Sequence, residues 1–167
     1  ASDRGFYGGM KRPILIIGKG GQLARAFAEA LAHRAVICGM PEIDLRDPSF
    51  TDALERGFGG GKVRAVINTA AYTFVDKAEG EGRDDAARIN GTAVAELAAW
   101  CKSQNVPLVH FSSDYVFDGK GSEPHLETEA PQPLNAYGQS KYAGEQAIIT
   151  SRCDYLIFRT SWIYDAQ

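Results

Sequence analysis

The sequence predicts a doubly wound α/β fold, in which helices cover both faces of a parallel sheet. Short apolar and β-branched runs alternate with longer helical stretches along the chain. The expected strands are nearly all apolar rather than alternating, which is typical of strands buried on both faces. A glycine-rich turn also separates the first strand from the first helix.

The first half of the chain is expected to hold three strands and two helices. An alanine-rich stretch predicts a helix at residues 22–32. A second helix is expected at 49–56, where Pro48 suits the start of a helix. Apolar, β-branched runs predict the strands at residues 13–17, 35–38 and 63–68.

The second half continues the alternation. Residues 84–103 form a long expected helix with Ala, Leu and Val on one face. A fourth strand is expected at 107–112, a helix at 136–151 and a fifth strand at 154–159.

Composition indicates one globular domain that works in the cytoplasm. The 167 residues are 44% hydrophobic and 23% charged, as in ordinary folded proteins. The net charge is −3 and the Lys and Arg residues are scattered, so the sequence gives no basic patch that would bind nucleic acid. No apolar run approaches the ~20 residues that span a bilayer, so no membrane partner is expected. Cys38, Cys101 and Cys153 lack metal-ligand or CxxC spacing and are expected to be reduced and buried.

The chain start is interpreted separately from the fold. Residues 1–9 lack the apolar segment of a secretion signal and are interpreted as a leader or an expression remnant. Met10 precedes the first strand like a natural start, so residues 10–167 are expected to form the domain.

The turn after the first strand reads Gly18-Lys-Gly-Gly21-Gln-Leu-Ala24. Gly18 permits a tight turn, and Gly21 lets the backbone approach a pyrophosphate at the helix N-terminus. Ala24 is small enough for close packing of helix on sheet. The turn favours a dinucleotide-binding (Rossmann) domain over an ordinary tight turn, because it follows a strand and opens a helix.

The sequence leaves the choice between NADH and NADPH open. An acidic residue about 20 positions after the turn would bind the ribose hydroxyls of NAD. Residues 38–41 instead read Cys-Gly-Met-Pro, with neither an acid nor an arginine.

Tyr137 and Lys141 are the strongest candidates for chemistry. They stand four residues apart in a helical stretch, so both side chains point the same way. A cation beside a phenol lowers its pKa from ~10 and makes it useful for moving protons at a carbonyl. This spacing also occurs by chance, so its context must decide.

Four segments supply that context, and together they resemble the extended short-chain dehydrogenase/reductase family. Within it they are most similar to the branch of dTDP-4-dehydrorhamnose reductases, and the resemblance runs from about Lys11 to Tyr164. The segments are NTAAYTFVDKAE at 68–79, FSSDYVFDG at 111–119, PLNAYGQSKYAGE at 133–145 and RTSWIY at 159–164.

The resemblance implies a role for each site residue. Ser113 would bind the C4 carbonyl of the sugar, and Tyr137 would donate a proton to it. Lys141 would lower the tyrosine pKa and hold the nicotinamide ribose. The other implied cofactor residues are Gly18, Gly21, Gln22, Leu23, Asp44, Leu45, Ala70, Ala71, Tyr72, Thr73 and Phe111. The implied substrate residues are Ser113, Asp114 and Trp162.

Several of these residues have a simpler interpretation. Ser113 could cap the end of a strand, and Asp44 could be a turn residue. Trp162 could be a half-buried core aromatic. His110, inside the fourth strand, is expected to be packed in the core, whereas His33 and His125 are expected at the surface.

Two departures from the family pattern matter. Members carry a carboxy-terminal region that builds most of the nucleotide-sugar pocket, and this sequence stops at Gln167. We therefore expect a truncated form, or one whose substrate half is supplied elsewhere. Some relatives bind Mg²⁺ at a dimer contact through a glutamate, but the matching residue here is Ala26. A homodimer is compatible with the resemblance, and no metal site is expected.

The leading hypothesis is an NADPH- or NADH-dependent reductase of the C4 keto group of dTDP-4-dehydrorhamnose. One alternative is a nucleotide-binding regulatory subunit, like the β subunit of methionine adenosyltransferase. Another is an epimerase or dehydratase that acts on a different nucleotide sugar.

Overall fold

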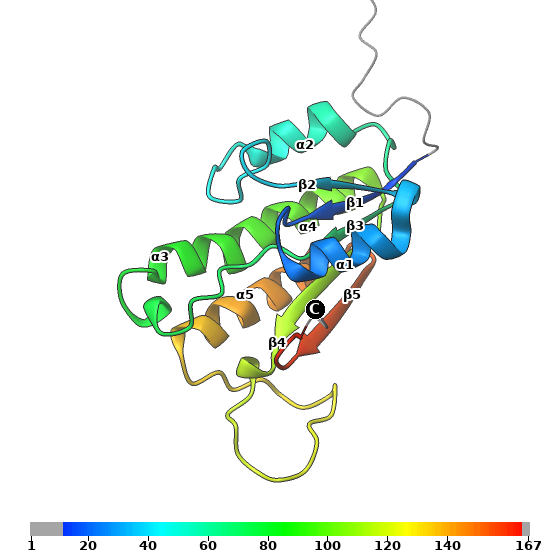
Figure 1. Cartoon of the computed structure of the whole chain (residues 1–167). Helices are drawn as coiled ribbons and strands as arrows, with labels where there is room; N and C mark the ends of the chain where they lie inside the picture. Colours follow the sequence, from blue (N-terminus) through cyan, green and yellow to red (C-terminus); the bar gives the residue numbers. More distant parts are fainter. Residues whose placement is uncertain (1–11, 165–167) are drawn as a thin grey trace, which may run out of the picture.

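A computed structural model describes residues 12–164, so the predicted leader at 1–9 lies outside the described residues. Within this range the chain forms a five-stranded parallel sheet in the order β2-β1-β3-β4-β5 (Figure 1). The strands are β1 Ile14–Ile17, β2 Ala35–Cys38, β3 Ala65–Asn68, β4 Leu108–Ser113 and β5 Tyr155–Thr160. The predicted doubly wound fold is confirmed.

The helices lie where the sequence predicted them, with small shifts at their ends. The α-helices are α1 Gln22–Leu31, α2 Phe50–Phe58, α3 Arg83–Ala86, α4 Ala93–Gln104 and α5 Ala136–Ser151. Short 3-10 turns, which were not predicted, are η1 Ala32–Arg34, η2 Lys77–Glu79 and η4 Asp114–Val116. A π-helical segment, η3 Ala87–Thr92, joins α3 to α4.

Helices cover both faces of the sheet over β1 to β4, which explains the apolar strands there, whereas Leu156 and Phe158 of β5 are exposed. Ala24 and Phe27 of α1 pack on one face, against Ile16 and Ile67. On the other face α2, α4 and α5 share one core with the sheet, built around Leu15, Val66 and Leu108 among others.

The long helix predicted at 84–103 is interrupted at η3, where it packs closely on α5. A Cβ added at Gly144 of α5 would collide with the carbonyl oxygen of Asn90. The Asn90 amide also donates a 3.0 Å hydrogen bond to the Ser140 hydroxyl. The backbones of η3 and α5 are thus in close contact. π-helical segments such as η3 are frequent at functional sites.

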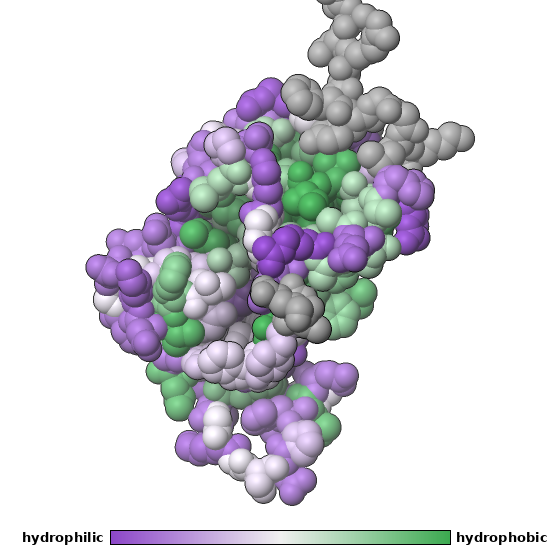
Figure 2. All heavy atoms as spheres, in the orientation of Figure 1, coloured by the Kyte–Doolittle hydropathy of each residue, from purple (hydrophilic) through white to green (hydrophobic). Residues whose placement is uncertain are grey.

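Helix α5 has the predicted bounds, and its first turn is fixed locally. The Asn135 side chain accepts a 2.7 Å hydrogen bond from the Gly138 N–H and so caps the helix. The loop that precedes it after η4 is largely hydrophilic, whereas hydrophobic side chains on this side gather over β1 and β2 (Figure 2).

Candidate active site

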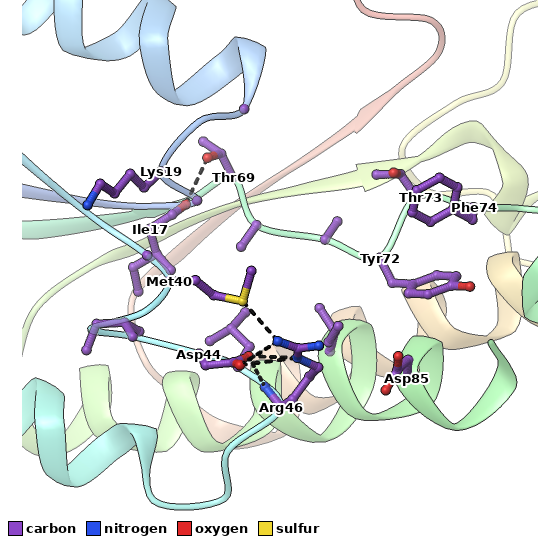
Figure 3. A pocket seen from close by; sticks show the side chains of 18 residues that line it. Ile17, Lys19, Met40, Asp44, Arg46, Thr69, Tyr72, Thr73, Phe74 and Asp85 are labelled. Atoms are coloured by element: carbon purple, nitrogen blue, oxygen red, sulfur yellow. Dashed lines mark hydrogen bonds and ion pairs between the residues drawn. The ribbon is translucent and has the colours of Figure 1, made fainter.

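A cavity of about 510 Å³ opens at the carboxyl ends of the first three strands, where open α/β sheets bind ligands (Figure 3). Three connections supply most of its wall: the turn after β1, the loop after β2 and the segment after β3. The lining residues are Ile17, Gly18, Lys19, Gly21, Gly39, Met40, Ile43, Asp44, Leu45, Arg46, Thr69, Ala70, Ala71, Tyr72, Thr73, Phe74, Asp85 and Ile89.

The glycine turn is shaped by packing at Gly18 and leaves space at Gly21. Gly18 has φ +123°, and a Cβ there would collide with the Thr69 hydroxyl and lie 2.9 Å from the Ala70 nitrogen. A Cβ at Gly21 would have only the Gly18 carbonyl oxygen nearby, at 3.3 Å. Gly21 lines the cavity and is the N-cap of α1, and it offers no side-chain hydrogen bond to the first N–H groups of the helix.

Arg46 supplies a cation to the cavity wall after β2, although the sequence at 38–41 offers none. Arg46 forms an ion pair with Asp44 at 2.7 Å and reaches the Met40 sulfur at 3.1 Å (Figure 3). Hydrogen bonds from Arg46 lower the pKa of Asp44. The Asp44 carboxylate also accepts the Arg46 N–H at 3.0 Å, so Asp44 is a turn residue as well as a lining residue.

Asn90 of η3 fixes the segment after β3. Its Oδ1 accepts the Tyr72 N–H at 2.9 Å, and its Nδ2 donates to the Tyr72 carbonyl oxygen at 3.0 Å. The same amide reaches Ser140 on α5. Asn90 therefore ties the cavity wall to the helix of Tyr137. Sequence reasoning missed Asn90, since a buried asparagine within a helical stretch gives no local signal.

Ser113, Tyr137 and Lys141 come together at the ends of β4 and α5. The Ser113 hydroxyl donates to Asp114 at 3.0 Å and accepts the Tyr115 N–H at 3.2 Å, so it also caps the strand end. The half-buried Tyr137 ring packs edge-on against Tyr115, with centroids 5.6 Å apart. Lys141 is 2% exposed, and its ammonium donates to the Phe111 carbonyl oxygen at 2.6 Å.

The pKa of Tyr137 differs from the expectation. Burial raises the pKa of Tyr137 above its ordinary value, a hydrogen bond with Ser113 opposes the rise, and Asp114 adds to it. The expected lowering by Lys141 is not what the structure shows, because the ammonium is turned to Phe111. Burial lowers the pKa of Lys141 to about 8, and attraction to Glu145 acts against that lowering.

Further polar groups lie beneath the trio and were not assigned from the sequence. Glu145 is 1% exposed and forms a 2.7 Å ion pair with Arg159 of β5. His110 is fully buried and lies 3.2 Å from the Asn68 amide. Burial and then Lys141 lower the pKa of His110 well below its usual value, so the ring is neutral. Its predicted place in the core is confirmed.

Some expected site residues lie outside this cavity in the described structure. Gln22 and Leu23 begin α1, and Phe111 stacks on Phe158 at 5.6 Å. Asp114 lines a separate cavity of about 270 Å³ beside η4. Trp162 is 78% exposed, so its interpretation as a core aromatic is wrong.

The remaining expectations concern surface and buried residues. His33 and His125 are exposed as predicted, and the three cysteines are free and buried. Within residues 12–164, every helix is too short or too polar to traverse a lipid bilayer. No group of three or more His, Cys, Asp or Glu side chains in that range is arranged to hold a metal ion.

Comparison with known proteins finds relatives that all point to one family. The model of a family described as the RmlD substrate binding domain matches residues 10–167. A dTDP-4-dehydrorhamnose reductase of Burkholderia thailandensis is 42% identical over 156 residues, which cover 92% of this chain and 51% of the relative. The enzyme of the same name from Escherichia coli K12 is 38% identical, over 90% of this chain and 51% of its own length.

Solved structures agree with the sequence relatives. A dTDP-4-dehydrorhamnose reductase from Clostridium acetobutylicum superposes with a TM-score of 0.83 at 36% identity, over 91% of this chain and 54% of that one. The Bacillus anthracis reductase, solved in complex with NADP, gives 0.82 at 35% identity, over 93% and 55%. The chain spans about half the length of the curated relatives it matches.

Proposed function

The chain belongs to the family described as the RmlD substrate binding domain, and from this premise we propose that it forms the cofactor-binding half of a reductase. The reaction is the NADPH- or NADH-dependent reduction of the C4 keto group of dTDP-4-dehydrorhamnose, which yields dTDP-L-rhamnose. The relatives that carry this activity by name match this chain at 36–42% identity.

One observation carries the proposal. The glycine-turn cavity and the set of Ser113, Tyr137 and Lys141 occupy the same carboxyl edge of one parallel sheet. Adjacent strand ends therefore offer a dinucleotide site beside a half-buried acid, Tyr137, and a buried cation, Lys141. A carbonyl reductase needs both features in contact.

The residues of the cavity fit a dinucleotide. A Cβ at Gly21 would meet only the Gly18 carbonyl oxygen, at 3.3 Å, and the N–H groups of the α1 N-terminus suit a pyrophosphate together with Gln22 and Leu23. Asp44 and Leu45 would border the adenine. Ala70, Ala71, Tyr72, Thr73 and Phe111 would border the rest of the cofactor. When bound, the reduced nicotinamide supplies the hydride for C4.

The protein's own groups would handle the oxygen and its proton. Ser113 would donate a hydrogen bond to the C4 oxygen, and Tyr137 would give its phenolic proton to that oxygen as it becomes an alcohol. Burial keeps Tyr137 protonated at neutral pH, so the acid is present before the reaction. Lys141 would stabilise the resulting phenolate and bind the nicotinamide ribose.

The rest of the enzyme would come from sequence beyond this chain. Residues 10–167 would be the dinucleotide-binding domain, and a carboxy-terminal domain would hold the dTDP-sugar with Asp114 and Trp162. A homodimer in the cytoplasm is the assembly we propose. Remote binding of the nucleotide positions the sugar and supplies several kcal/mol of the barrier reduction, roughly 7–11 kcal/mol in the best intramolecular cases.

Cofactor binding tests the first part of the proposal. Fluorescence titration of the chain with NADPH and NADH should show saturable binding, and Gly21→Leu should abolish it by filling the pyrophosphate space. Gly57→Leu is the matched control, because the Cβ position of Gly57 on α2 is open and Gly57 does not line the cavity. Unchanged affinity in Gly21→Leu would remove the turn from the site.

Turnover tests the second part. We expect the full-length protein to reduce dTDP-4-dehydrorhamnose and the isolated 167-residue chain to do so negligibly. A regulatory subunit would bind nucleotide without turnover, and an epimerase would not consume the reduced cofactor. Comparable kcat/KM for both proteins would show that the substrate site lies within this domain.

A further inference from the structure

Two charged side chains of α5, Lys141 and Glu145, are buried, and a third, Arg159 of β5, is partly buried, although only Lys141 has a role in the proposed reaction. Lys141 and Glu145 are 2% and 1% exposed, and the Arg159 side chain is 22% exposed. Buried charges are costly unless they are paired, so such a set is rare in a structural core.

Glu145 is held in one place from the sheet side. Arg159 Nε donates to its two carboxylate oxygens at 3.0 and 3.3 Å, and Nη2 donates to Oε2 at 2.7 Å. This fork-like contact fixes both position and orientation of the carboxylate. The Arg159 guanidinium lies over the Phe117 ring at 5.0 Å, which holds it from the other side.

Glu145 also faces Lys141, because it lies one helical turn further along the same face of α5. The Lys141 ammonium is tied to the sheet through the Phe111 carbonyl oxygen. Among the titratable groups around the site, Tyr137 on α5 and His110 on β4 are neutral at pH 7, and Asp114 of η4 acts on Tyr137 rather than on Lys141. Glu145 is therefore the anion that favours the charged form of Lys141.

We propose that Glu145 is a positioning residue of the active site: fixed by Arg159 one helical turn after Lys141, its carboxylate is the counter-ion that keeps the lysine charged. The proposal rests on the proposed function for the role of Lys141, and it adds a counter-ion that acts through that lysine. Arg159 sets the strength of the effect, because it shares the carboxylate charge with Lys141.

Substitutions of Glu145 and of Arg159 should shift the titration midpoint of Lys141 in opposite directions. A merely structural role of Glu145 predicts no such shifts. Glu145→Gln removes the anion and should lower the pH midpoint at which Lys141 loses its proton by at least about one unit, below the wild-type value near 8. Arg159→Met frees the carboxylate to act on Lys141 alone and should raise that midpoint. Glu96→Gln is the matched control, since Glu96 forms a comparable ion pair with Arg88 at 2.8 Å.

The midpoint is measured on the full-length protein by NMR of ¹³C-labelled lysine, with the Lys141 signal assigned by its loss in Lys141→Met. Opposite shifts in the two variants and none in Glu96→Gln would support the proposal. Equal midpoints in wild type and Glu145→Gln would overturn it. If Glu145→Gln does not fold, Arg159→Met decides: a higher midpoint supports the proposal, and an unchanged or lower one overturns it.

A cofactor titration across pH separates this proposal from the proposed function. Affinity for NADPH should be lost at a lower pH in Glu145→Gln than in wild type, because a neutral Lys141 no longer binds the ribose. Absence of NADPH and NADH binding by the wild type would refute the proposed function and leave the NMR result to judge Glu145. Binding with the same pH profile in both proteins would refute the role of Glu145 alone.

Discussion

The two halves of the candidate site are built by different physical means. The proposed cofactor side, at the ends of β1 and β3, is shaped by backbone: Gly18 fits beside Thr69 only without a side chain, and a Cβ at Gly21 would meet only the Gly18 carbonyl oxygen. The proposed catalytic side, at the ends of β4 and α5, depends on charged side chains that are buried away from water. Lys141 and Glu145 are 2% and 1% exposed there.

This difference separates a part of the site that buries no charge from a part that does. Backbone N–H groups at a helix N-terminus attract an anion without burying any charge. A buried ammonium costs free energy that the fold must supply elsewhere, although the low dielectric also makes it more effective at the reacting atoms. The predictions below test that contrast, beginning with the largest effect.

Replacing the proposed acid should affect chemistry far more than binding. In the full-length enzyme, Tyr137→Phe removes the proton donor and should lower kcat by about 10²- to 10⁴-fold, equivalent to roughly 3–5 kcal/mol of barrier. Cofactor affinity should stay near the wild-type value, as measured by fluorescence. Tyr142→Phe, on the same helix, is the control and should be close to wild type. Retention of kcat within a few-fold would mean that Tyr137 is not the donor.

Removing the buried ammonium should stabilise the fold. Because burial lowers the pKa of Lys141 from 10.5 to about 8, holding the charge costs roughly 3 kcal/mol below pH 8. Lys141→Met should therefore raise the free energy of unfolding by up to that amount at pH 7. The gain should fade between pH 8 and 10.5, where the folded lysine becomes neutral before the unfolded one does.

Urea denaturation at pH 7 and pH 10 measures this gain, with the exposed Lys102→Met as control. A loss of stability in Lys141→Met that is independent of pH would contradict the view that the catalytic side carries a costly charge.

On the cofactor side, the first glycine should matter for folding itself. Gly18→Ala must adopt φ +123° and meet Thr69 and Ala70, which should cost about 1–3 kcal/mol of stability. Gly21→Ala, which has an ordinary φ of −74°, should fold with nearly wild-type stability. Thermal unfolding of both variants compares them. Equal losses of stability in the two variants would contradict the view that Gly18 is needed for folding and Gly21 is not.

The smallest expected effect concerns the cap of the catalytic helix. Asn135→Ala removes the 2.7 Å hydrogen bond to the Gly138 N–H and should cost about 1 kcal/mol. Gln139→Ala, exposed on the same helix, should cost less. Denaturation curves measure both, and a cost for Asn135→Ala no larger than that control would mean that packing alone holds Tyr137.

The fold could be predicted largely from the sequence because its signals are local. The apolar strands, the alanine-rich first helix and the bounds of α5 depend on residues close together in the chain. The interruption at η3 could not be predicted, because it arises where Gly144 of a distant helix meets the Asn90 carbonyl. The roles of Ser113, Tyr137 and Lys141 remain predictions that rest on family resemblance.

By itself, the sequence determined the order of elements and the spacing that puts Tyr137 and Lys141 on one helical face. It also determined the glycines that let the backbone approach a ligand. Only the tertiary structure decided the electrostatics: Arg159 meets Glu145 across 14 positions, and Lys141 finds the Phe111 carbonyl 30 positions away. Burial and charge depend on what long-range packing brings together, so the pKa of Tyr137 rose where the local pattern had predicted a fall.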